Sequence, residues 1–434
     1  MRRTQTLLAP VLLLAACVSD DDNLNPVPDD PAPDPATRTE TVGDAPLRLP
    51  VRHDGVPNPA YVFAETLADD ARAQTPPDDR TDSPAWEAFY DPNAVHEVRI
   101  LLSPEARDDL ERDGRNWVPA FVTVDGIEFP NAGVHRKGST TWQGLSQKPS
   151  MKIKLQEYGE GPRLIGLERI TLNNMVSDPA QAREVIALRL WRALGAVATR
   201  ASWAKLWIDD QPYGVYSNIE SLDDEWLQRR YDRYDGDLWE ANDDADFTAG
   251  GLPAWELAEG LGDTTRLEAL ADALNGDAPT FEQQVGHLVD TDQFLQYWAT
   301  CLVTGATDGY PFHLNDAYMY ADPADGGRFD FVPWGMDEAW DVTFNPWVDG
   351  LLARACEADA DCAARLDAAV LAALTTLEGL DVDAMVSEAY SVSEPLLSDD
   401  ERRPYTGAAV AIARAELRAR IAAWPGLVRQ QLGL

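Results

Sequence analysis

The sequence predicts an α+β fold in which a β-rich N-terminal lobe precedes a mainly helical C-terminal lobe. From residue 95 to about 221, short alternating apolar runs separated by turn signals surround a single long helical pattern. From about 222 to 434, apolar residues recur mostly at helical spacing. A chain of 434 residues, 45% of them hydrophobic, can build the large cores that two lobes need.

Local signals define the elements of the N-terminal lobe. Ser103 and Pro104 are typical of a helix start, and Asp125-Gly126 between two β-rich runs predicts a hairpin. Asp178-Pro179 and Gly195 mark the start and the end of a longer helix. The expected strands are 95–102, 133–137 and 150–155, with a polar loop at 138–149, and a second hairpin is formed by 202–208 and 214–220 around the turn "DDQPY".

The C-terminal lobe is expected to be helical apart from one β hairpin. That hairpin lies within 316–334, where two β runs surround a turn rich in Asp and Gly. The expected helices are 266–276, 281–289, 291–303 and 407–432.

The N-terminus has the pattern of an export signal. Arg2 and Arg3 precede the apolar run "LLAPVLLLAA", which is too short to span a bilayer, and Cys17 follows it. The stretch "LLAAC" resembles a bacterial lipobox, which implies a signal peptide at 1–17 and lipidation of Cys17. Residues 18–46 are rich in Asp and Pro and are expected to form a disordered tether, followed by an N-terminal extension at 47–94.

The charge of the chain limits its partners. A formal net charge of −38 argues against nucleic acid, whose phosphates the protein would repel. We interpret the acidity as a solvated surface rather than as metal-binding tracts. The membrane is expected to be contacted only through the lipid anchor.

Export would place the remaining cysteines in an oxidising compartment. Cys356 and Cys362, in "CEADADC", are expected to form a disulfide, because no further Cys or His pair accompanies them to complete a zinc site. Cys301 is expected to be a buried small hydrophobic residue.

Positive charge gathers in the stretch "GVHRKGSTTWQGLSQKPSMKIKL". Lys152 and Lys154 are two apart in a strand, so they project from one face and repel each other unless an anion lies between them. The loop before them offers Gly138, Ser139 and neighbouring threonines as donors for phosphate oxygens. A solvated polar hairpin with edge lysines is the alternative, because the loop matches no established phosphate-binding motif.

Carboxylates and an amide form a second candidate group. Glu184 shares a helix face with apolar residues and would need a cationic partner, although a surface carboxylate near a helix N-terminus is an equally ordinary interpretation. Asp308, Asn315 and Asp337 are hard oxygen ligands of the kind that hold Mg²⁺ against phosphates. Taken singly, each is also typical of turns and helix caps.

Together these segments resemble the CotH kinase family, atypical secreted enzymes named for a spore-coat protein. The matching stretches include "GVHRKGSTTW", "KPSMKIKL", "LNNMVSDPAQAREVIALRLWRALG" and "TDGYPFHLNDAYMYADPADGGRFDFVPWGMDEAW". They follow one another in the family's order, and the similarity extends from about residue 95 to near the C-terminus. The resemblance implies a bilobal protein-kinase-like fold, with an N-lobe at about 95–221 and a C-lobe at about 222–434.

The resemblance also implies an activity and a set of roles. The family binds ATP with Mg²⁺ or Mn²⁺ and transfers the γ-phosphate to Ser or Thr. Lys152 or Lys154, with Gly138 and Ser139, would contact the phosphates, and Glu184 would pair with the lysine. Asp308 would be the catalytic aspartate, and Asn315 and Asp337 the metal ligands.

One position departs from the family. Its usual pattern is Pro-Trp-Asp-x-Asp, whereas this chain has Gly335 before Met336 and Asp337. The loss of one carboxylate at Gly335 favours a pseudokinase, whereas the other matching residues favour an enzyme. Together with the lipobox, the resemblance implies a lipid-anchored kinase of the cell envelope, facing the periplasm or exterior, that acts on surface or coat proteins. The alternative is a pseudokinase that serves as a binding or structural protein of the envelope. The acidic surface predicts a preference for basic substrate segments.

Overall fold

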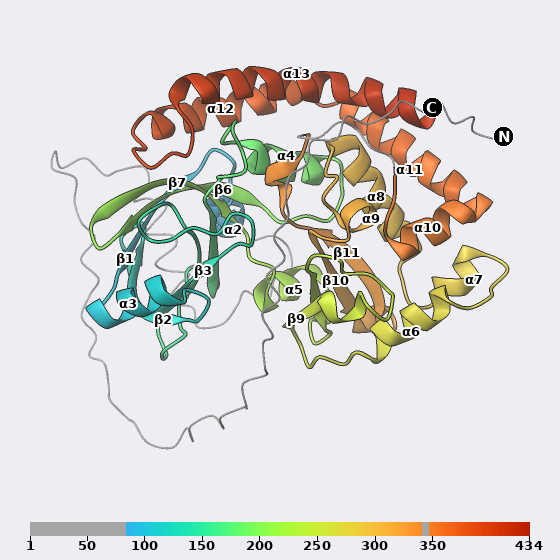
Figure 1. Ribbon diagram of the computed structural model, residues 1–434, viewed down its shortest axis with the longest axis horizontal. Coiled ribbons are helices and arrows are strands. Elements are labelled where there is room, and N and C mark those ends of the chain that lie inside the picture. The colour runs from blue at the N-terminus through green and yellow to red at the C-terminus, as the bar shows by residue number, and fades with distance from the viewer. Residues whose placement is uncertain (1–83, 341–346) are drawn as a thin grey trace. The chain divides into compact units, whose positions relative to one another are not determined.

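In the computed structural model, which describes residues 84–340 and 347–434, seven strands of the N-terminal half form a closed barrel (Figure 1). Its strand order is β1-β2-β3-β4-β5-β7-β6, and a parallel pairing of β1 with β6 closes it. The strands are β1 (Val95–Leu101), β2 (Val118–Val124), β3 (Ile127–Lys137), β4 (Ser150–Lys154), β5 (Arg169–Asn173), β6 (Ala201–Ile208) and β7 (Gln211–Ile219).

Alternation of apolar and polar residues explains the barrel. Inward side chains such as Ile100, Val122 and Ile153 are buried, whereas their neighbours along the strands are more exposed. The expected hairpin at Asp125-Gly126 is confirmed, and both residues have positive φ, at 48° and 85°. The second hairpin is also confirmed, but its turn is shorter than expected, because β7 starts directly after Asp209 and Asp210.

Helix α2 (Pro84–Phe89) precedes the barrel and belongs to its core. Trp86 and Phe89 are each 1% exposed, so the described fold begins before residue 95, inside the expected N-terminal extension. Helix α3 (Pro104–Arg112) starts as expected, with the Ser103 Oγ accepting a hydrogen bond from the Ala106 N–H.

Helix α4 (Arg183–Ala193) begins later than Asp178-Pro179 suggested. The Asp178 carboxylate is buried and accepts hydrogen bonds from the N–H groups of Ala182 and Arg183, at 2.6 and 2.8 Å. Asp178 therefore accepts hydrogen bonds from N–H groups at the start of the helix, although it precedes the helix by several residues. The buried apolar side chains of α4 belong to the core of the C-terminal half.

A second sheet lies in the C-terminal half, with strand order β11-β10-β8-β9. Strands β10 (Ala317–Asp322) and β11 (Arg328–Pro333) form the hairpin expected within 316–334. Strands β8 (Leu238–Ala241) and β9 (Trp255–Glu259) were not expected from the sequence, because each is too short to show a clear alternation. The same holds for β5.

Helices make up most of the C-terminal half, so the α+β class and the division into a β-rich and a mainly helical part are confirmed. The long α12 and α13 lie side by side (Figure 1). The α-helices are α5 (Asp224–Arg230), α6 (Thr265–Leu274), α7 (Phe281–Val285), α8 (Thr291–Thr304), α9 (Tyr310–His313), α10 (Leu351–Ala358), α11 (Ala360–Glu378), α12 (Val382–Ser398) and α13 (Gly407–Leu432). Short 3₁₀ turns occur at η1 (Leu252–Ala254), η2 (Pro323–Asp325) and η3 (Met336–Glu338).

The cysteines that the structure describes agree with expectation. Cys356 and Cys362 form a disulfide between α10 and α11, with Cα atoms 5.2 Å apart, and Cys301 is a buried free thiol. Cys17, the signal peptide and the tether lie outside the described residues. Within residues 84–340 and 347–434, no helix combines the length and the apolar character that crossing a membrane would need.

A buried ion pair joins the barrel to the C-terminal half. The Lys148 Nζ lies 2.7 Å from the Asp400 Oδ2, and these side chains are 4% and 0% exposed. The Asp400 carboxylate also accepts hydrogen bonds from the N–H groups of Val215 and Arg402, at 3.0 and 2.8 Å. Because Gly214 has φ of 91° and a Cβ there would overlap the carboxylate, glycine is required at this close approach.

Replacing Lys148 by Met should lower the free energy of unfolding by about 3–5 kcal/mol, because Asp400 would stay buried without its counter-charge. Urea denaturation followed by circular dichroism measures this. Arg112→Met, which removes an exposed pair with Asp109, is the control and should cost less than about 1 kcal/mol. Equal losses of unfolding free energy in the two variants would show that the buried pair stabilises the fold no more than the exposed pair does.

Candidate functional site

A cavity of about 420 Å³ brings the barrel and the second sheet together around charged side chains. The barrel contributes strands β3 to β5 and the loop after β3, and the C-terminal half contributes the ends of β8 and β11 and the segment before β10. The sequence-predicted residues that line it are Gly138, Ser139, Lys152, Asp308, Asn315 and Asp337. Residues far apart in the sequence therefore meet in one place.

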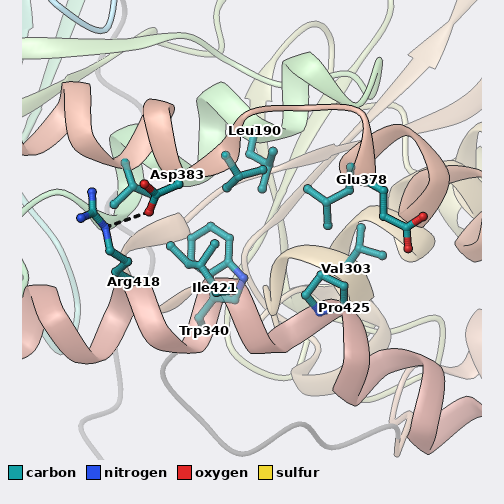
Figure 2. A pocket seen from close by; sticks show the side chains of 12 residues that line it. Leu190, Val303, Trp340, Glu378, Asp383, Arg418, Ile421 and Pro425 are labelled. Atoms are coloured by element: carbon teal, nitrogen blue, oxygen red, sulfur yellow. Dashed lines mark ion pairs between the residues drawn. The ribbon is translucent and has the colours of Figure 1, made fainter.

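Another cavity, of about 180 Å³, is lined mainly by apolar side chains of α4, α8, α11, α12 and α13 (Figure 2). Its charged lining residues are Glu378 and the ion pair between the Arg418 Nε and the Asp383 Oδ1, 3.1 Å apart. It lacks the convergent set of acids, amides and lysines that the 420 Å³ cavity has, so we place the candidate site in the latter.

Two lysines form the positive side of the site. In the pairing of β3 with β4, His135 lies opposite Lys152 and Lys137 lies opposite Ser150, so alternation puts both lysines on one face. Lys152 makes no hydrogen bond or ion pair with another described residue. The Lys137 Nζ donates a 2.6 Å hydrogen bond to the Asn173 Oδ1, and burial followed by the charge of Lys152 lowers the pKa of Lys137. An anion between the two ammonium groups would relieve their repulsion.

The other basic residues of this stretch have structural partners. Arg136 donates to the carbonyl groups of Gln143, Glu111 and Asp113. Lys154, expected as a phosphate ligand, does not line the cavity, and its Nζ lies 3.1 Å from Glu157 and 3.7 Å from Glu168. The structure thus separates Lys152 from Lys154, which the sequence left as alternatives.

The loop after β3 forms the rim beside the lysines. Gly138 has φ of 107°, and a Cβ there would lie 2.6 Å from the Thr141 Oγ1, so the close turn favours glycine. The buried Asn174 holds the loop by donating to the carbonyl groups of Thr141 and Lys148, at 3.1 and 2.8 Å. The Ser139 side chain lines the cavity and is exposed.

Glu184 lies behind the lysines, in the first turn of α4, and is 4% exposed. It accepts hydrogen bonds from the Asn173 Nδ2, at 2.9 and 3.1 Å, and from the Ser217 Oγ, at 3.0 Å. Burial, reinforced by the charge of Asp337, raises the pKa of Glu184 to about 7. The expected ion pair with Lys152 is not formed among the described residues. The lysine whose charge lowers the pKa of Glu184 is Lys137, and Asn173 forms hydrogen bonds with both side chains.

The segment between α8 and β10 supplies the first acidic residues. Asp308 and Asn315 face each other, with the Asn315 Nδ2 3.4 Å from the Asp308 Oδ2, while the His313 Nδ1 lies 3.2 Å from the Asp308 Oδ1. A backbone bridge between Gly309 and Asn315 holds this segment in a closed turn. The amide and the imidazole orient the Asp308 carboxylate.

The segment after β11 completes the acidic side. Asp337 lies in η3, and burial raises its pKa, an effect that Lys137 opposes. Asp316 also lines the cavity, and burial together with the charges of Asp308 and Asp337 raises its pKa well above the ordinary range. The Trp334 N–H donates to the Asp316 carbonyl at 3.2 Å, which ties the two acidic segments together.

These residues fit a metal-nucleotide complex better than a bare ion. Within the described residues, no three His, Cys, Asp or Glu side chains are grouped as a metal cage. Mg²⁺ commonly takes only one or two protein carboxylates and completes its shell with water and substrate phosphates. Carboxylates on one wall and lysines on the other match that donor set.

Sequence reasoning missed several residues of the site: Lys137, Asn173, Glu240 and Asp316. The signal for Lys137 was present, since the strand alternation that selected Lys152 and Lys154 also applies to the neighbouring strand. Asp316 directly follows Asn315, and only Asn315 was predicted as a metal ligand. Nothing in the sequence pointed to Asn173 or Glu240, which lie in the short strands β5 and β8.

Two solved structures resemble parts of this chain. One is the *Helicobacter pylori* proinflammatory kinase CtkA, at 10% identity with a TM-score of 0.29, covering 65% of this chain and 95% of that chain. The other is HipA of *Shewanella oneidensis* MR-1, from a complex with HipB and operator DNA, at 14% identity with a TM-score of 0.29, covering 69% and 70%.

Curated relatives match this chain at higher sequence identity. Inner spore coat protein H of *Bacillus subtilis* is 25% identical over 187 residues, which cover 40% of this chain and 51% of the relative. Invasin CotH2 of *Rhizopus delemar* is 23% identical over 256 residues, covering 54% and 40%. The chain thus spans about half or less of the length of these relatives. Residues 134–372, more than half of the chain, match the family described as CotH kinase protein, and the chain belongs to that family.

Proposed function

We propose that this protein is an ATP-dependent kinase that transfers the γ-phosphate to Ser or Thr of protein substrates. The observation that carries the proposal is the single cavity in which Lys137 and Lys152 face Asp308, Asn315 and Asp337. Membership of the CotH kinase family gives it independent support.

The roles of the residues follow from their charges and positions. Lys137 and Lys152, with the rim at Gly138 and Ser139, bind the phosphate oxygens. Asp308 lies next to Asn315 and His313, and its carboxylate accepts the proton of the substrate hydroxyl. The substrate oxygen then forms its bond to the γ-phosphorus while the bond to the β–γ bridging oxygen breaks, and ADP leaves.

The expected divalent cation, Mg²⁺ or Mn²⁺, would be held by Asp337 and Asn315. When bound with ATP, such a cation neutralises the charge that develops on the phosphate oxygens. Glu184 and Asn173 position Lys137 from behind, so their contribution is to the geometry of the phosphate site rather than to the chemistry.

We place the protein outside the cytoplasm. The apolar run before Cys17 supports export and lipid attachment, and the named relatives are an inner spore coat protein and an invasin. The substrates would be proteins of the cell surface or coat, and the net charge of −38 favours basic segments in them.

A second candidate function is a pseudokinase that serves as an envelope binding or structural protein. The observation in its favour is Gly335, which leaves the segment after β11 with Asp337 and the exposed Glu338 as its acidic residues. Such a protein would bind nucleotide without transferring phosphate.

The soluble chain from residue 46 should incorporate label from γ-labelled ATP with Mg²⁺ or Mn²⁺. Asp308→Asn should reduce incorporation by about 10²-fold or more, since it removes the proton acceptor without changing the side-chain size. A basic protein such as histone serves as the added substrate, and Asp367→Asn, in α11, is the control. Absence of label in the folded parent, with or without the added substrate, would favour the pseudokinase.

Lys137→Met should weaken binding of a fluorescent ATP analogue by about tenfold, because it removes a charge that contacts phosphate. Lys154→Met is the matched control from the neighbouring strand and should bind normally, because Lys154 pairs with Glu157 and Glu168. A larger loss for Lys154→Met than for Lys137→Met would contradict the assignment.

Glu184→Gln should gain stability relative to the parent as the pH rises. The folded chain holds the Glu184 proton up to a pKa of about 7, whereas the ordinary pKa of a glutamate is 4.5, so this group's contribution to stability falls as the pH rises through that interval. The difference in unfolding free energy should change by about 2 kcal/mol between pH 5 and pH 8. Urea titrations at several pH values test this, and the exposed Glu401→Gln should show no such trend.

A further inference from the structure

Gly335 lies against the side chain of another acidic residue. Its φ of 59° is in the left-handed region, and a Cβ built on it would overlap the carboxylate group of Asp316. The overlap involves both carboxylate oxygens and the carbon between them, so no rotation of a larger side chain at 335 would avoid it. The space beside residue 335 is therefore already filled by a carboxylate.

The backbone fixes this arrangement. Asp316 has φ of 43°, and its carbonyl accepts a hydrogen bond from the Trp334 N–H, the residue before Gly335. Strand β10 then pairs Ala317 with Pro333, so both sides of the contact are held by the sheet. The backbone of Asp316 is therefore held beside Gly335 at the start of the β10–β11 hairpin.

We propose that Asp316 is a carboxylate ligand of the divalent cation, and that glycine at position 335 is what allows its side chain to enter the site. The inference rests on the proposed function, because it takes a metal-nucleotide complex as the occupant of the cavity. It assigns the cation to carboxylates from two segments, Asp316 before β10 and Asp337 after β11.

The proposal explains how the acidic side of the cavity is kept although Gly335 removes one carboxylate from the segment after β11. Asp308, Asp316 and Asp337 all line the same cavity, opposite Lys137 and Lys152. A carboxylate carries a full charge to the cation where an amide such as Asn315 carries only a dipole, so Asp316 is the stronger ligand of the two neighbours.

Binding of Mn²⁺ tests the proposal without relying on activity. Electron paramagnetic resonance of free Mn²⁺ gives the affinity of the full soluble chain, alone and with a non-hydrolysable ATP analogue. Asp316→Asn, which keeps shape and removes charge, should weaken Mn²⁺ binding by about tenfold or more. Asp243→Asn is the matched control, an exposed carboxylate on the rim of the same cavity, and should bind as the parent does.

Moving the carboxylate from position 316 to position 335 by mutation gives a second test. D316G should lose Mn²⁺ affinity, and D316G/G335D should recover at least part of it, because removing the side chain at 316 frees the space at 335. Thermal unfolding of each variant confirms that it is folded. G335A, whose Cβ would displace the Asp316 carboxylate, should bind Mn²⁺ more weakly than the parent.

The outcomes separate this inference from the proposed function. If the parent binds Mn²⁺ with the ATP analogue and Asp316→Asn binds equally well, the Asp316 assignment is wrong and the metal-nucleotide site stands. If the parent binds neither Mn²⁺ nor the analogue, both proposals fail. Loss in Asp316→Asn together with recovery in the D316G/G335D double variant would establish the assignment.

Discussion

The site depends on the way a buried carboxylate, Glu184, obtains its hydrogen bonds. A charge without partners would be costly at 4% exposure, and the Asn173 amide supplies them while its oxygen accepts from Lys137. One side chain thus links β3, β5 and α4. Because α4 also packs into the core of the C-terminal half, the same amide connects the phosphate side of the cavity to the helices.

The acidic wall is organised by the second sheet. Strands β10 and β11 bring the segments that carry Asp316 and Asp337 to the same end of a hairpin. Gly335 has the positive φ that this junction needs and leaves room for a neighbouring carboxylate. The loss of a carboxylate at position 335 is therefore compatible with a site that keeps its acidic residues, because the Asp316 carboxylate lies beside Gly335.

Much of this arrangement could be predicted from the sequence, and the strands that it did not predict share a cause. Periodicity and turn residues identified α4, α8, α13, both barrel hairpins and the lysine strand, and motif order brought Asp308, Asn315 and Asp337 together. The long helices α11 and α12 were expected only as part of a mainly helical lobe. Strands β5, β8 and β9 are too short to show a period, so Asn173 and Glu240 stayed hidden. The choice of Lys137 as the lysine near Glu184 depends on the pairing of β3 with β4 and on the bridging Asn173 amide. Local sequence predicts neither of these.

The pair between Lys148 and Asp400 has a consequence for how the chain can be divided. The loop that precedes Lys152 is held by a residue far beyond any boundary near 221, and Arg402 adds hydrogen bonds to the carbonyl groups of Leu145 and Gln147. A fragment ending at 221 would lack the carboxylate that pairs with Lys148 and accepts from the Val215 N–H. Any division of the chain near 221 therefore breaks a buried ion pair that the two lobes share.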